Sequence, residues 1–136
     1  MTSPDAAFQQ DMSVTEFAMA DDVHGLAEVR AWTRATLSGL PEEMITDVVM
    51  VVDELSSNAL RHARAPYLVR LRHVGGRLRV EVEDGAPGSP ARPGPPTGTG
   101  GHGLTLVALS TTAWGQTARP EGKTVWAELD IGRADD

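Results

Sequence analysis

The segment from Leu40 to Ala63 constrains the fold more than any other part of the chain, because its apolar residues recur with the period of a helix. β-Branched residues are frequent here, so propensity alone would also allow a strand, but the spacing favours a helix. Pro41 suits the first turn, and Glu42 and Glu43 complement its positive end. The apolar positions are Ile45, Val48, Val49, Val52, Leu55, Ala59 and Leu60. The sequence therefore predicts a long helix with one buried face.

Alternating apolar and polar residues predict strands on either side of this helix. The expected strands are residues 13–20, 67–74, 77–85, 116–120 and 124–131, with hairpin turns at 75–76 and 121–123. Helical spacing predicts two more helices, at 21–39 and at 103–115. Asp21 or Asp22 is the expected N-cap of the first of these, and Gly39 its C-cap.

The expected order is strand, two helices, two strands, loop, helix, two strands. This order predicts an α+β fold, a two-layer sandwich with helices on one face of the sheet. The chain has 136 residues, which is enough for a single core. Residues 1–12 are polar and unpatterned, so we expect a disordered tail followed by one domain at 13–136.

Composition excludes several classes of function. The formal charge of −7 argues against direct binding to nucleic acid, which normally requires a basic surface. The chain has no cysteine, so disulfides, thiol chemistry and cysteine-bound zinc are excluded. No apolar run is long enough to span a membrane and no signal peptide is evident, so we expect a cytoplasmic protein.

Three polar residues interrupt the long helix at intervals of four, in the stretch "DELSSNALRHA". At about 100° per residue, Glu54, Asn58 and His62 share one face. A solvent-facing stripe would explain each residue singly. Leu55 and Ala59 adjoin the stripe on the core side, however, which places it at the margin of the core, where clefts form. There an amide oxygen suits Mg²⁺, and a carboxylate could polarise a water or a hydroxyl.

Two further features stand at strand and loop boundaries. Asp84 ends a strand, where a carboxylate can accept from an exocyclic amine such as that of adenine, although Asp-Gly is also a common turn. Residues 85–102 hold six glycines and five prolines, so the segment is either a functional loop or a linker. The stretch "GTGGHGLTLV" then opens a helix, where glycines and free amides can hold phosphate. It matches neither a Walker A loop nor a Rossmann fingerprint.

In this order the three features resemble the GHKL ATPase superfamily, or Bergerat fold, and within it the bacterial anti-sigma-factor serine kinases. "DELSSNALRHA" resembles the N box, "VEVEDGAPG" the G1 box, "GGHGLTLV" the G2 box and "WGQTARPEGKTVWAEL" the closing strands. The resemblance covers about residues 14–131. It implies a mixed, mostly antiparallel sheet and a flexible ATP lid.

The resemblance also implies roles for individual residues. Glu54 would be the general base, and Asn58 would hold Mg²⁺ against the phosphates of ATP. Asp84 would bind the adenine amine, with Thr124 assisting through a shared water. Gly101, Gly103 and the amide of Leu104 would wrap the phosphates, and Gly88, the remaining glycine of the G1 pattern, would also bind the nucleotide.

Other positions leave alternatives open. Arg61 and His62 would either face phosphate or cap the helix, and His102 would touch phosphate or point to solvent. Ala86 stands where the G1 pattern usually has glycine, which predicts weaker nucleotide binding. The chain shows no phospho-accepting histidine helix or sensor, so a conventional two-component kinase is not expected.

Two functions follow from the resemblance. The first is a serine/threonine kinase that phosphorylates an anti-sigma-factor antagonist and sequesters a sigma factor, with a homodimer implied. The alternative is a module that senses ATP without catalysis, or binds only a protein partner. The expected partner surface is the first helix, with Glu28, Arg30 and Arg34, and with Trp32 either an anchor or part of the core.

Overall fold

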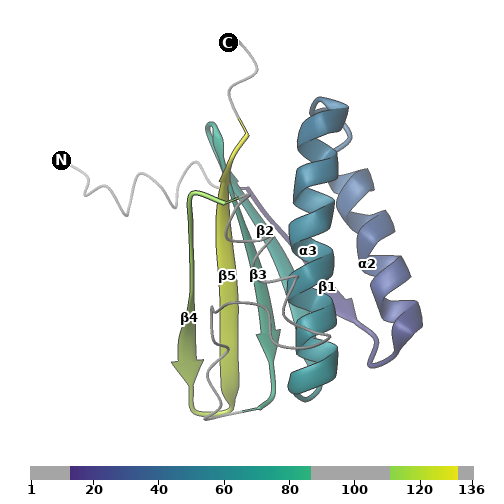
Figure 1. Cartoon of the computed structure of the whole chain (residues 1–136), viewed down its shortest axis with the longest axis vertical. Coiled ribbons are helices and arrows are strands. Elements are labelled where there is room, and N and C mark those ends of the chain that lie inside the picture. The colour runs from purple at the N-terminus through teal and green to yellow at the C-terminus, as the bar shows by residue number, and fades with distance from the viewer. Residues whose placement is uncertain (1–12, 87–110, 132–136) are drawn as a thin grey trace, which may run out of the picture.

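A five-stranded sheet covered on one face by two helices makes up residues 13–86 and 111–131, the parts that the computed structural model describes (Figure 1). The two-layer α+β architecture is therefore confirmed. The elements in chain order are β1 (Ser13–Met19), α2 (Val23–Thr36), α3 (Glu42–His62), β2 (Tyr67–Val74), β3 (Arg77–Asp84), β4 (Ala113–Arg119) and β5 (Gly122–Asp130).

The sheet has the order β1-β2-β3-β5-β4, and each of its four strand pairs is antiparallel. The expectation of a mixed sheet is thus corrected for the described strands. Each hairpin has a two-residue turn, and an antiparallel pair can be joined this tightly whereas a parallel pair cannot. Gly75 in the first turn has φ of 56°, the left-handed region that glycine adopts without cost.

Helix α3 lies along the inner face of the sheet, as its apolar spacing predicted. Its buried side chains meet the inward residues of β2, β3 and β5 in one core. The fully buried members from the helix and the sheet include Val48, Val51, Val52, Val69, Leu78, Val80 and Ala127. The predicted period of the helix is confirmed, because the residues that recur every three or four positions are those that meet the sheet.

Helix α2 packs beside α3 and runs in the opposite direction (Figure 1). Asp22 is its N-cap, accepting from the amide of Gly25 at 3.1 Å, which confirms one of the two predicted caps. The predicted C-cap is wrong. The helix ends at Thr36, and Leu37 is the cap. Leu37 is buried, and it lies two residues before the glycine at position 39.

The expected partner surface on α2 is partly occupied by contacts within the chain. Arg30 forms an ion pair with Asp53 of α3, and Arg34 forms one with Glu42 at 2.9 Å. Trp32 is half-buried and stacks on Phe17 of β1, with 5.4 Å between ring centroids. Trp32 therefore belongs to the margin of the core.

Strand β4 corrects the predicted end of the helix at 103–115. Residues 113–115 lie in β4, where Trp114 pairs with Ala127 of β5. The amide of Thr112 already donates to the carbonyl of Glu128 at 2.8 Å. Cross-strand pairing therefore overrides the helical spacing at these positions. Residues 111 and 112 are not helical either, whereas residues 103–110 of that predicted helix, the predicted tail and residues 132–136 lie outside the described residues.

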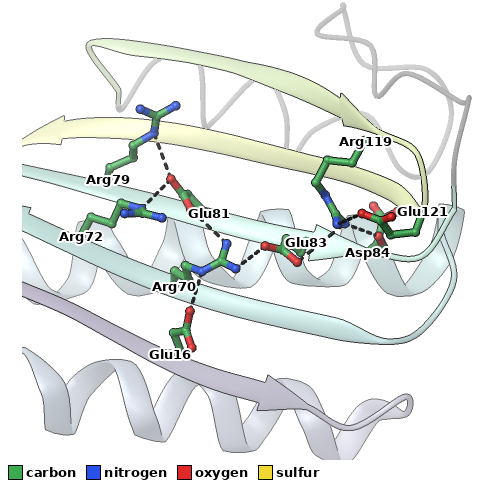
Figure 2. A network of polar contacts seen from close by, with 9 residues as sticks. All are labelled: Glu16, Arg70, Arg72, Arg79, Glu81, Glu83, Asp84, Arg119 and Glu121. Atoms are coloured by element: carbon green, nitrogen blue, oxygen red, sulfur yellow. Dashed lines mark hydrogen bonds and ion pairs between the residues drawn. The ribbon is translucent and has the colours of Figure 1, made fainter. Parts of the chain in front are cut away.

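The outer face of the sheet carries a network of arginines and glutamates (Figure 2). Arg70 forms ion pairs with Glu16, Glu81 and Glu83, so it links β1, β2 and β3. Arg79 contacts Glu81 at 3.4 Å, and its guanidinium lies 4.2 Å from the ring centroid of Trp126.

Across the described ranges, neither helix is long and apolar enough to cross a membrane.

Candidate functional site

Two of the three stripe residues lie at the margin of the core. Glu54 and Asn58 are half-buried, and the neighbouring Leu55 and Ala59 are buried. His62 is exposed in the last turn of the helix. Of the three stripe residues, only Glu54 and Asn58 therefore lie at the margin of the core.

The carboxyl group of Glu54 has a raised pKa. Burial is the largest cause, and the negative charge of Asp53 adds to it, while the positive charge of Arg61 opposes both. A carboxylate with a raised pKa is a better proton acceptor near neutral pH than an ordinary one. Its electrostatic surroundings therefore fit Glu54 to the role of a general base.

The side chain of Asn58 stands one turn further along α3. It is half-buried, and it forms no hydrogen bond with another described residue. Within residues 13–86 and 111–131, no three His, Asp or Glu side chains are grouped as a metal site. Mg²⁺ usually takes few protein ligands and keeps waters and substrate phosphates. Asn58 therefore fits a metal that arrives with a nucleotide.

Asp84 ends β3 at the same end of the molecule as the last turns of α3 (Figure 1). The amide of Gly85 donates to the carbonyl of Arg64 at 2.6 Å, which ties the end of β3 to the segment after α3. Asp84 is only 2% exposed, and its Oδ1 accepts from the amide of Ala86 at 2.9 Å. The predicted position at a strand end is confirmed, and so is the turn-forming contact.

Tyr67 at the start of β2 adds a third polar group to this end of the sheet. The pKa of its hydroxyl is raised, first by burial and then by the charge of Asp21 and a hydrogen bond to it. The charge of Asp84 raises that pKa further. Both carboxylates therefore disfavour ionisation of the phenol.

The structure corrects the placement of Thr124. Thr124 pairs with Glu83, which lies on the outer face of the sheet, whereas Asp84 points to the inner face. Successive side chains of a strand alternate between faces, so Thr124 cannot share a water with the carboxylate of Asp84. Lys123 pairs with Asp84 instead, and its Nζ lies 3.0 Å from Oδ2.

Lys123 is therefore a site residue that reading the sequence missed. Its side chain is 8% exposed. It stands next to a threonine that resembled part of a motif, and the resemblance did not separate the two residues. The signal that could have found it is the apolar alternation of Val125 and Ala127, because residues two apart on a strand share a face and Lys123 is in phase with them.

A model of the histidine kinase-like ATPase domain matches residues 19–129. The chain belongs to this family. The match begins at the last residue of β1 and ends one residue before the end of β5, so it includes Glu54, Asn58 and Asp84. A comparison with curated proteins gave no match.

Solved structures share the fold of this histidine kinase-like ATPase domain. The RsbU and RsbW domains of Rv1364c from Mycobacterium tuberculosis align with a TM-score of 0.68 at 20% identity, over 89% of this chain and 33% of that one. A blue-light activated histidine kinase from Erythrobacter litoralis aligns at 0.56 and 23%, over 82% and 42%. The histidine kinase AdeS from Acinetobacter baumannii aligns at 0.54 and 12%, over 90% and 71%. The chain thus spans a third of the first of these proteins.

Several predicted residues of the ATPase domain lie outside the described part of the chain. These are Gly88, Gly101, His102, Gly103 and Leu104, together with the expected lid. Their roles stay predictions.

Arg61 and His62, for which two roles were open, lie in the described part of the chain, and so does Ala86. Arg61 and His62 are both exposed in the last turn of α3, where positive charge complements the helix dipole.

Ala86 does not adopt a positive φ, so its methyl group causes no backbone strain there. The weaker nucleotide binding expected from this alanine stays a prediction.

Proposed function

We propose that this histidine kinase-like ATPase domain is an ATP-binding regulatory protein, a serine/threonine kinase of the anti-sigma-factor type acting in the cytoplasm. The observation that carries the proposal is the half-buried pair on α3, with Glu54 at a raised pKa and Asn58 free of hydrogen bonds to described residues. Asp84 stands at the same end of the molecule, as a nucleotide bridging the helix and the sheet would require.

Each residue would have a distinct task. Bound Mg-ATP would supply the phosphoryl group and offset its charge. Asn58 would orient the metal through its amide oxygen, and Asp84 would hold the base. Glu54 would take the proton of the attacking serine or threonine hydroxyl. Catalysis of this kind rests on positioning and electrostatics, which half-buried groups on a rigid helix supply.

The proposed partners are an anti-sigma-factor antagonist as substrate and a sigma factor as the sequestered protein, with a second copy of the chain as a further partner. The structural similarity to a chain that contains an RsbW domain supports these proposed partners. Because the present chain spans 33% of that protein, the partners are part of the proposal.

The test is phosphate transfer from Mg-ATP to an anti-sigma-factor antagonist of the same genome, read as phosphoserine or phosphothreonine by mass spectrometry. We expect Glu54→Gln to abolish transfer while nucleotide binding by calorimetry stays within about threefold. The exposed Glu43 of the same helix offers a matched control, and Glu43→Gln should transfer normally. Undiminished transfer in Glu54→Gln would rule out this base.

A second candidate is a module that senses ATP or binds only a protein partner, without catalysis. The contact that favours it is Lys123 to Asp84, because this carboxylate is already paired before any base arrives. Calorimetry with Mg-ATP separates the possibilities. Binding without transfer would identify a sensor, and no heat at millimolar ATP would identify a partner-binding module.

A further inference from the structure

The only lysine of the chain is buried at the candidate base site. Lys123 is 6% exposed and lies on β5 directly across from Asp84 on β3. Its Nζ contacts Oδ2 at 3.0 Å. A buried ammonium is costly unless it is paired, so the pair holds both side chains in place.

This contact changes what the carboxylate offers to a ligand. The amide of Ala86 donates to Oδ1 and Lys123 donates to Oδ2, so both oxygens already accept a hydrogen bond. Any donor of a purine, whether an amino group or a ring N–H, would share these oxygens with the amide and the ammonium, and each oxygen has a lone pair left for it. The ammonium has three donors and uses one on Asp84, so it can donate to an acceptor on the ligand.

We propose that Lys123 determines base specificity at this site, so that a 6-oxo purine binds at least as tightly as a 6-amino purine. The carbonyl of a 6-oxo purine accepts from Lys123, while the adjacent ring N–H donates to Asp84. A 6-amino purine would instead place its amino group, a donor, against the ammonium, and its unprotonated ring nitrogen, an acceptor, against the carboxylate. The inference rests on the proposed function, because it assumes that the base of a nucleotide binds at Asp84.

ATP and ITP are the sharpest pair of probes, because they differ only in the amino and oxo groups and the associated ring proton. Calorimetry with each Mg-nucleotide gives the ratio of dissociation constants for the wild type and for Lys123→Met, which keeps an apolar stem of similar length. We expect ITP to bind the wild type at least as tightly as ATP. We expect Lys123→Met to prefer ATP by about tenfold or more, because hydrogen bonds to charged groups are worth that much.

The matched control is Arg119→Gln. Arg119 lies beside the same residue but donates to the carbonyl oxygen of Asp84 (2.9 Å) and not to its carboxylate. This variant should keep the wild-type ratio. A wild-type preference for ATP, or a ratio that Lys123→Met leaves unchanged, would overturn the inference and leave the proposed function standing. No binding of either nucleotide to the wild type would overturn both.

A second measurement covers the case in which Lys123→Met does not fold. With one lysine in the chain, ¹⁵N-lysine labelling marks a single side-chain amine for NMR. Titration of the wild type with ITP should shift this resonance, with a smaller shift for ATP. A resonance that neither nucleotide moves at saturation would contradict a role for Lys123 in base recognition.

Discussion

Gly122 lies so close to Asp84 that a Cβ atom at position 122 would stand 1.8 Å from the carbonyl oxygen of Asp84. The same oxygen accepts from Arg119 Nη2 at 2.9 Å. The β4–β5 turn and the end of β3 therefore meet through backbone contact at the candidate site. Since Asp84 also pairs with Lys123, the position of its carboxylate depends on this close approach.

The first prediction concerns that approach. Gly122→Ala should lower the free energy of unfolding by about 1–3 kcal/mol, because the added methyl group forces β3 and β5 apart. Chemical denaturation measures the change. The control is Gly39→Ala, where nothing lies within 4 Å of the added Cβ, and it should be nearly neutral. Equal stability of the two variants would contradict the close contact.

The second prediction concerns the pH dependence of transfer. Activity should rise with pH through the raised pKa of Glu54, because only the carboxylate accepts a proton. Asp53→Asn removes a charge that raises this pKa, so the acidic limb of kcat/KM should move to lower pH. Arg61→Gln removes a charge that lowers it, so the limb should move to higher pH. Limbs that do not move in either variant would argue against Glu54 as the base.

The third prediction uses Tyr67, the only tyrosine of the chain. Its folded pKa lies above the ordinary value of 10.0, so its contribution to stability is present below that pH and is lost as pH rises through the folded pKa. The near-ultraviolet absorbance of tyrosinate measures the titration. Asp21→Asn and Asp84→Asn should each lower the pKa, the former more, because Asp21 also accepts the hydrogen bond. An unchanged titration in Asp84→Asn would contradict the proximity of the two groups.

The fourth prediction concerns the network on the outer face of the sheet. The side chain of Arg70 is 16% exposed and contacts three glutamates. Arg70→Met should therefore lower the free energy of unfolding by about 2 kcal/mol or more, because Glu81 and Glu83 each lose one of their positively charged partners. Arg34→Met removes an exposed pair and should cost at most about 0.5 kcal/mol. Denaturant titrations of both variants test this difference. Similarly small decreases in the free energy of unfolding for both variants would mean that water replaces Arg70 in the network.

Local pattern accounts for most of the fold. The spacing of Val48, Val52 and Leu55 predicts α3, and the alternation of β2 and β3 predicts their hairpin. The same reasoning failed at residues 113–115, where helical spacing continues but pairing with β5 makes a strand. It also failed at Gly39, since the helix ends at Thr36 and Leu37 is its cap. The long-range pairing that decided the first case leaves no signal in a short window.

By itself, the sequence determined the elements of the sandwich and the placement of Glu54, Asn58 and Asp84 on them, because periodicity and strand ends are local properties. Only the tertiary structure decided which residue of β5 lies across from Asp84. Thr124 and Lys123 are neighbours in the chain, and a shift of one residue in the register of β5 against β3 would exchange their faces. That register follows from packing Val125 and Ala127 into the core, and it puts an ammonium where the motif suggested a hydroxyl.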